Sequence, residues 1–183
     1  MNKLKCSAIM AFILLGFIST IAQDKYKLIN SSVRFFSSTP VEDIEAENKA
    51  SLGVLDTKTG NFSVRVPITE FKFKSTLMED HFNENYMESE KYPNATFKGV
   101  IKDPINLGKD GVYKVTADGD FETHGVVQKR QIPLTITVAK GVVTYTSEFK
   151  VKLEDHQIKV PTVVFAKIAE VIDVKLNGEL QKI

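Results

Sequence analysis

The sequence predicts an all-β fold in which a long antiparallel sheet closes on itself, with one α-helix in a long connection. Several stretches alternate apolar and polar residues. Period-two alternation makes one face of each strand apolar and the other wet, and sheets with one wet face are usually antiparallel. The strands also reach about ten residues, against a typical five or six. Long strands with one wet face favour a sheet that curves into a barrel.

The strands can be placed from the alternation and from the turns between them. Alternation covers residues 62–68, 113–121, 132–138, 172–180 and, more briefly, 149–153. Turn-forming residues gather at 56–60, 108–111 and 123–125, each between two strand-like runs. After Ile68 the apolar positions change from even to odd numbers and continue at Phe71 and Phe73. A β-bulge near Thr69 would restore the face, so we expect one there.

One helix is expected between these strands. Thr76 is followed three residues later by Glu79, which is the capping-box pattern at a helix start. Met78, Phe82 and Tyr86 then recur at four-residue spacing and share one face, with Leu77 and His81 beside them. The helix must end before Pro93, because a proline disfavours a helical predecessor.

The N-terminal segment predicts export. Residues 1–22 combine two early lysines, a short apolar run and small residues before a cut after Ala22, which is the layout of a signal peptide. The apolar run is shorter than the roughly 20 residues that span a bilayer. We therefore expect one domain over residues 23–183, in the periplasm or secreted. Cleavage after Ala22 removes Lys3, Lys5 and Cys6. The remaining chain has 22 basic and 23 acidic residues, a net charge of −1, and no cysteine. This composition excludes a disulfide framework and a thiol nucleophile, and it argues against a nucleic-acid partner, which needs a basic patch.

The order of these segments resembles the YceI-like family of exported lipid-binding proteins. The resemblance is carried by residues 53–56, 62–67, 78–82, 86–99, 119–126 and 168–169, and residues 91–99, with Lys91-Tyr92-Pro93 and Thr96-Phe97-x-Gly99, are the most specific. It covers about residues 25–183. One departure is at residues 36–41, where many members carry a histidine followed by glycines. The resemblance implies an extended antiparallel eight-stranded lipocalin-like barrel that binds and carries or stores a long-chain apolar lipid, a polyisoprenoid, an isoprenoid quinone or a fatty-acid derivative.

The candidate ligand-binding residues are mostly aromatic and are spread over every predicted element. They are Phe35, Phe71, Phe73, Met78, His81, Phe82, Tyr86, Phe97, Phe121, Phe149 and Phe165. Ligand sites are mostly apolar with few polar groups, so this set would suit a lipid tail. The same residues would also fill a solid barrel of eight strands, and the resemblance favours the cavity. No cofactor is expected beyond the bound lipid. A transient membrane contact and a monomeric or homodimeric state are both compatible with a lipid-binding barrel.

Two other functions stay open at this point. An exported enzyme would use His81 and nearby acids, although the sequence contains no Gly-x-Ser-x-Gly nucleophile elbow and we expect no enzyme. A filled structural barrel would act through its outer surface. The three histidines, His81, His124 and His156, lack metal-site spacing, so no metal is expected. On the helix flank, His81 fits a half-buried, hydrogen-bonded histidine at least as well as a ligand contact.

Overall fold

Ten β-strands lie within the part of the chain that the structure, a computed structural model, describes, residues 25–160 and 168–183. The strands are β1 (Lys25–Ser38), β2 (Asp43–Asn48), β3 (Leu52–Asp56), β4 (Asn61–Pro67), β5 (Phe71–Phe73), β6 (Asn94–Ile101), β7 (Gly111–Thr123), β8 (Val126–Ala139), β9 (Val142–Lys152) and β10 (Val171–Lys182). The helical segments are η1 (Ile68–Glu70), α1 (Thr76–His81), η2 (Phe82–Tyr86) and η3 (Glu154–His156). The predicted signal peptide, residues 1–22, lies outside the described residues.

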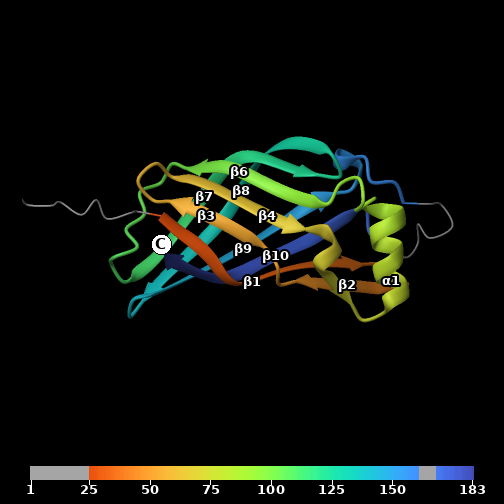
Figure 1. Cartoon of the computed structure of the whole chain (residues 1–183), viewed down its shortest axis with the longest axis horizontal. Helices are drawn as coiled ribbons and strands as arrows, with labels where there is room; N and C mark the ends of the chain where they lie inside the picture. Colours follow the sequence, from red (N-terminus) through yellow and green to blue (C-terminus); the bar gives the residue numbers. More distant parts are fainter. Residues whose placement is uncertain (1–24, 161–167) are drawn as a thin grey trace, which may run out of the picture.

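Antiparallel pairing closes the strands into a barrel (Figure 1). The order runs β1–β3–β4–β6–β7–β8–β9–β10, and β10 returns to pair with β1. β2 pairs with the second half of β1, and β5 pairs with β2, so β2 continues the line of β3 and β5 continues that of β4. The ten segments therefore form a closed eight-stranded antiparallel barrel with one short helix, as predicted. α1 stands at one end, and β1 begins and β10 finishes at the opposite end (Figure 1).

Three neighbouring strands are irregular at one level, which we call the waist (residues 29–32, 49–51 and 68–70). The pairing of β1 with β10 shifts register between Ile29 and Ser32, where Asn30 has a φ of 49°. Beside this shift, the chain is interrupted between β2 and β3 and again between β4 and β5. The fully buried Asn48 joins the two breaks, because its Nδ2 donates to Pro67 O at 2.6 Å and its Oδ1 accepts from the Ala50 amide at 2.8 Å. Backbone groups that the interrupted ladders leave unpaired thereby gain partners.

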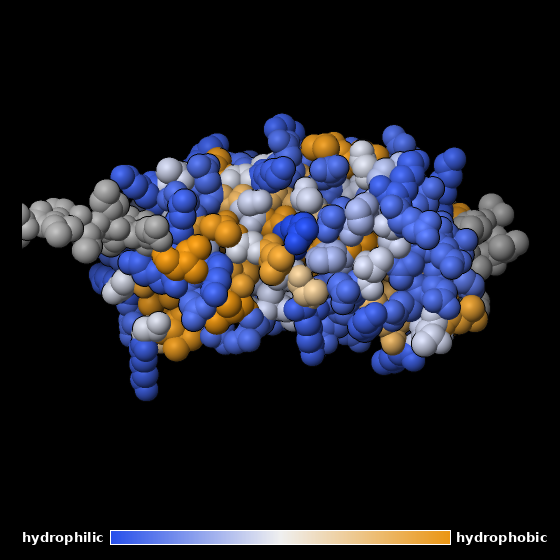
Figure 2. Space-filling model, viewed as in Figure 1, coloured by the Kyte–Doolittle hydropathy of each residue, from blue (hydrophilic) through white to orange (hydrophobic). Residues whose placement is uncertain are grey.

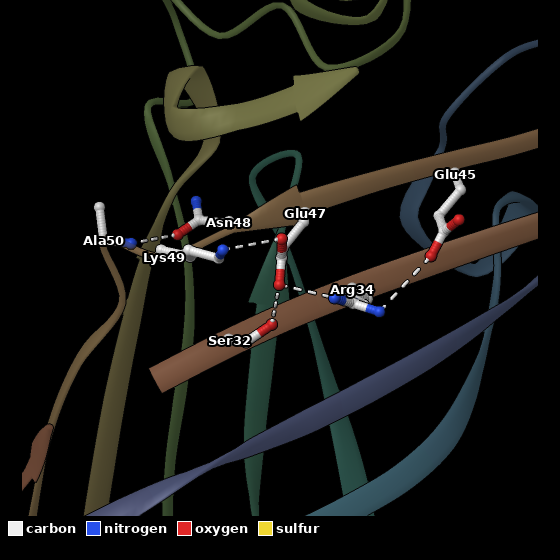
Figure 3. Close-up of polar contacts among 7 residues, drawn as sticks. All are labelled: Ser32, Arg34, Glu45, Glu47, Asn48, Lys49 and Ala50. Atoms are coloured by element: carbon white, nitrogen blue, oxygen red, sulfur yellow. Dashed lines mark hydrogen bonds and ion pairs between the residues drawn. The ribbon is translucent and has the colours of Figure 1, made fainter. Parts of the chain in front are cut away.

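The outer side of the waist is held by a charged cluster (Figure 3). Glu47 Oε1 on β2 accepts from Ser32 Oγ at 2.7 Å and from Arg34 Nε at 3.1 Å on β1. Lys49 Nζ lies 3.2 Å from Glu47 Oε2. These donors, led by the Ser32 hydroxyl, hold the pKa of Glu47 below its ordinary value. The cluster therefore links β1 to β2 where the backbone departs from regular pairing.

The half of the barrel between the waist and the end opposite α1 is filled with side chains. At the centre of this half lies Ile136, whose side chain is 0% exposed. Its buried neighbours in the core come from β3, β6, β7, β8, β9 and the loop after β6, and include Leu55, Ile101, Leu107, Val115, Val138 and Val143. Period-two alternation sends Val115, Ile136 and Val138 inward from β7 and β8, as the sequence predicted.

Two local predictions differ from the structure. The change of parity after Ile68 is made by the single 3-10 turn η1 rather than by a β-bulge at Thr69. The capping box is wrong as well, because Ser75 is the N-cap residue and makes no side-chain cap bond. Glu79 instead accepts from Lys72 Nζ at 2.7 Å, which ties α1 to β5. Among the described residues, no helix combines the length and the apolar character needed to cross a bilayer.

Candidate ligand cavity

The barrel is hollow between the waist and the α1 end. The cavity there has a volume of about 470 Å³, within the range of about 300–1,000 Å³ typical of small-molecule sites. Every strand except β3 contributes to its wall, and most of the lining side chains are apolar. None of the described side chains that line it is a lysine or an arginine. An apolar molecule can therefore bind in this cavity without burying the positive charge of a lysine or an arginine.

The floor of the cavity lies just past the waist. On β7, Ala117 lines the cavity, whereas the next inward residue, Val115, is buried but does not line the cavity. On β9 the same step occurs between Tyr145, which lines the cavity, and Val143. Burial raises the pKa of the Tyr145 phenol, against a smaller opposite effect of its hydrogen bond to Ser31. The floor is therefore made of small, apolar and uncharged hydroxyl side chains.

Four phenylalanines form a ring cluster near the α1 end. Phe82, the first residue of η2, stacks on Phe35 with ring centroids 5.4 Å apart and lies 5.0 Å from Phe73 and 5.6 Å from Phe71. Phe35 comes from β1, and Phe71 and Phe73 come from β5. Aromatic pairs at these distances contribute about 0.5–1.5 kcal/mol beyond their burial. The cluster therefore fastens the helical segment to the barrel while its rings line the cavity.

The structure brings the predicted site residues together. Ten of the eleven line this one cavity, namely Phe35, Phe71, Phe73, Met78, His81, Phe82, Tyr86, Phe97, Phe121 and Phe149. Phe165 lies outside the described residues. The role of these residues in holding a ligand stays a prediction.

His81 lies on α1 at the rim of the cavity. It is exposed, so the expectation of a half-buried histidine that fixes the helix on the barrel is wrong. Glu42, from the loop after β1, also lines the rim. Within residues 25–160 and 168–183, no group of three histidine, cysteine or acidic side chains is placed to hold a metal ion. The rim thus places the polar side chains of His81 and Glu42 beside a large apolar wall.

Comparison with known proteins assigns the chain to a family. A family model for the YceI-like domain matches residues 26–180. The chain belongs to the YceI-like domain family. Solved structures share the fold: a polyisoprenoid binding domain from Saccharophagus degradans implicated in plant cell wall breakdown aligns with a TM-score of 0.74 at 13% identity, over 88% of this chain and 99% of that one. BcnA from Burkholderia cenocepacia aligns with a TM-score of 0.68 at 16% identity, over 82% and 95%. The YCEI protein of Campylobacter jejuni aligns with a TM-score of 0.53 at 20% identity, over 73% and 81%. No curated protein matches the sequence.

Four residues from the segments that carry the YceI-like resemblance meet beside the cavity, and we call them the hairpin latch (Glu88, Tyr92, His124 and Gly125). His124 Nε2 lies 2.8 Å from Glu88 Oε2, and its Nδ1 lies 3.0 Å from His156 O. The Tyr92 ring packs edge-on against His124 at 4.7 Å, and a Cβ on Gly125 would come within 2.4 Å of that ring. The latch therefore joins the segment after η2, the β7–β8 turn and η3.

His156 packs between the latch and the cavity wall. It is fully buried, and its ring lies edge-on to Phe121 at 5.1 Å. Its Nδ1 lies 3.2 Å from Val126 O, and its Nε2 has no hydrogen-bond partner among the described residues. Burial lowers the pKa of this imidazole. The neutral form of His156 is therefore favoured behind the cavity wall, where its ring packs against Phe121.

Sequence reasoning missed the aliphatic and hydroxyl parts of the lining. Inward residues such as Val64, Ile132 and Leu134 follow from the alternation, yet only the aromatic residues were selected. Ser31 and Tyr145 were missed because they are polar or lie outside the clean alternating runs. The available signal was parity along β9, where Val143, Tyr145 and Ser147 all face inward.

Proposed function

We propose that this YceI-like barrel binds and carries or stores one long apolar lipid, an isoprenoid or a fatty chain, in the cavity between the waist and α1. The observation that carries the proposal is an apolar cavity of about 470 Å³ with no described lysine or arginine in its wall. The family assignment supports it. So does the structural likeness to a domain described as polyisoprenoid binding.

Partitioning from water supplies the binding free energy. Twenty buried carbon groups correspond to about 16 kcal/mol at ~0.8 kcal/mol each. Association opposes this with about 4–15 kcal/mol of lost freedom. The balance is favourable for a long tail and unfavourable for a short one, so tail length sets affinity and no charged anchor is needed.

The segment from Met78 to Ser89 would act as the gate. Phe82 attaches it to the barrel through three ring contacts, and Leu77 on α1 lines the cavity while it is 61% exposed. Neither α1 nor η2 contains a buried residue. Separating Phe82 from its three partners would open the α1 end without unfolding any strand.

The predicted signal peptide supports action outside the cytoplasm, in the periplasm or as a secreted protein. There the lipid would be exchanged with a membrane during a transient contact, and the wet outer faces of the strands would keep the loaded protein in solution. The surface over α1 is hydrophilic in Figure 2, whereas apolar side chains gather over β1 and β3 toward the other end. Exchange through the α1 end would therefore be brief rather than a stable membrane attachment.

Native mass spectrometry of the chain from residue 23, purified without detergent, tests the proposal. We expect a stoichiometric adduct that organic solvent releases and that is identified as a lipid. Ala95→Phe places a ring into the cavity from β6, and Val112→Phe adds the same ring on the exposed outer face of β7 as a matched control. The first variant should lose the adduct and the second should keep it. An apo mass in the wild type, with no uptake of an offered isoprenoid, would refute the carrier function.

A further inference from the structure

The floor of the cavity contains three linked hydroxyl groups. Ser31 Oγ lies 2.7 Å from the Tyr145 hydroxyl and 2.6 Å from Ser51 Oγ. The three residues are 6%, 4% and 5% exposed for Ser31, Tyr145 and Ser51. Ser31 and Tyr145 line the cavity, and Ser51 lies behind them. A polar group is therefore available at the deep end of a mostly apolar cavity.

These three hydroxyl groups have one O–H proton more than the hydrogen bonds among them require. Three hydroxyls carry three O–H protons, and two O···O contacts use two of them. Among the described residues no further side-chain hydrogen bond is made by these three groups. When Ser51 donates to Ser31 and Ser31 donates to Tyr145, the phenol proton is free to point at a molecule in the cavity. A buried acceptor placed there would complete the network.

The backbone is built to place these hydroxyls. Asn30 adopts a positive φ of 49°, and the register shift beside it turns Ser31 inward after Leu28. Gly178 on β10 lies across from Tyr145, and a Cβ there would come within 2.8 Å of the Tyr145 hydroxyl and 3.0 Å of Ser31 Cα. Only glycine leaves room for the two hydroxyls to meet.

The surroundings limit the chemistry of the acceptor. With no lysine or arginine among the described lining residues, a carboxylate or a phosphate at the floor would be desolvated without a counter-charge. A carbonyl or a hydroxyl oxygen would be buried with one good hydrogen bond. The phenol suits this role, because burial keeps it protonated and able to donate.

We propose that Tyr145, oriented by Ser31 and Ser51, donates a hydrogen bond to an uncharged carbonyl or hydroxyl oxygen of the lipid, which enters with its polar end toward the floor. This inference rests on the proposed function and narrows its ligand class to neutral lipids with a polar end. The tail then extends toward α1, along the aromatic wall. The ligand is held by partitioning, and the floor selects its end group.

A matched pair of probes tests the inference on the mature protein. Farnesylacetone is an isoprenoid methyl ketone, and the comparison probe is the hydrocarbon in which CH₂ replaces its carbonyl. The wild type should bind the ketone about fivefold to tenfold more tightly than the hydrocarbon, the size expected for one net hydrogen bond. Tyr145→Phe should bring the ratio to one or below, because the buried carbonyl oxygen then has no donor. The infrared carbonyl band of the bound ketone should shift to higher frequency in the variant, which a purely structural hydroxyl would not cause.

Tyr113→Phe is the control, because the Tyr113 hydroxyl binds loop carbonyls of Asn106 and Lys109 away from the cavity. It should keep the preference. If Tyr145→Phe fails to fold, Ser31→Ala is measured in its place and should reduce the ratio. An unchanged ratio in a folded Tyr145→Phe or Ser31→Ala protein, or no preference in the wild type, overturns the floor site while the carrier function stands. If neither probe binds the wild type, the proposed function fails and the floor site fails with it.

Discussion

The two halves of the barrel are built from the same long strands, yet one half is solid and the other is hollow. Toward the end opposite α1, branched aliphatic side chains from several strands are buried with Ile136 in the core. Toward α1, aliphatic and aromatic side chains together line a cavity, and the ten phenylalanine and tyrosine rings among them stand along its wall. The waist separates the halves. Stability and ligand binding are therefore assigned to different parts of one barrel and can be changed separately.

The largest effect is expected in the solid half. Ile136→Ala removes the most deeply buried aliphatic side chain of the core and should lower the free energy of unfolding by about 2–5 kcal/mol. Ligand stoichiometry should not change, because Ile136 does not line the cavity. Denaturant unfolding and native mass spectrometry of the same sample measure the two quantities. A loss of bound ligand in the folded variant would contradict the separation of the halves.

The waist should give the next effect. Asn48→Ala leaves Pro67 O and the Ala50 amide without their partner, and should cost about 1–3 kcal/mol. Because Asn48 joins the breaks of two strands, amide exchange should increase in β2 and β5 more than in β8. Hydrogen exchange measured by NMR gives both results. Uniform loss of protection over the whole barrel would show that the waist does not divide the fold.

The hollow half should respond in kinetics more than in stability. Phe82→Ala removes three ring contacts from a half-buried position and should lower the free energy of unfolding by about 1–2 kcal/mol. The rate of ligand dissociation should rise about tenfold, because the closed position of α1 and η2 would lose about 1.4 kcal/mol of stabilisation. Stopped-flow displacement of a fluorescent fatty probe measures this rate. An unchanged rate would remove α1–η2 as the gate, whereas Asn85→Ala, at an exposed position of η2 that does not line the cavity, should leave the rate unchanged.

The smallest effect is a pH dependence at the border of the cavity. Burial lowers the pKa of His156 below its ordinary value of 6.5, so the unfolded chain binds this proton more readily than the folded one. The contribution to stability is complete above pH 6.5 and is lost as the pH falls toward the folded pKa, with a slope of at most about 1.4 kcal/mol per pH unit.

Substitution isolates this contribution from other titrating groups. The stability difference between the wild type and His156→Gln should shrink as the pH falls below 6.5 and stay constant above it. Urea unfolding at a series of pH values measures the difference. A constant difference over the whole range would mean that His156 binds its proton equally well in both states.

The sequence predicts the barrel and most of the cavity because both depend on local patterns. Alternation along β7, β8 and β10 sets which side chains face inward, and Phe121 on β7 follows from that parity. Phe71 and Phe73 on β5 follow from the change of parity after Ile68. Hollowness does not follow from parity, because the same residues would also fill a barrel. It depends on how far facing strands stand apart, which is a property of the closed sheet.

The waist and the floor site were not predicted because they are made by contacts distant in sequence. Ser31 meets Tyr145 across 114 positions of the chain, and Asn48 meets Pro67 only after both strands have broken. The polar run Asn30-Ser31-Ser32 is the local sign of an interrupted strand, since asparagine tolerates a positive φ. Near Thr69 the parity change was recognised, but a 3-10 turn and a bulge produce the same change in the sequence.

The central claim is that the ligand occupies the hollow half only, and intermolecular nuclear Overhauser effects test it most directly. A ¹³C-labelled barrel loaded with unlabelled farnesylacetone gives contacts between ligand and protein protons. We predict contacts from Phe35, Val64 and Ile132 in the cavity wall and none from Val138 or Val143 in the solid core. Contacts confined to exposed positions such as Leu52 and Val54 on the outer face of β3 would place the ligand on the surface and contradict the account.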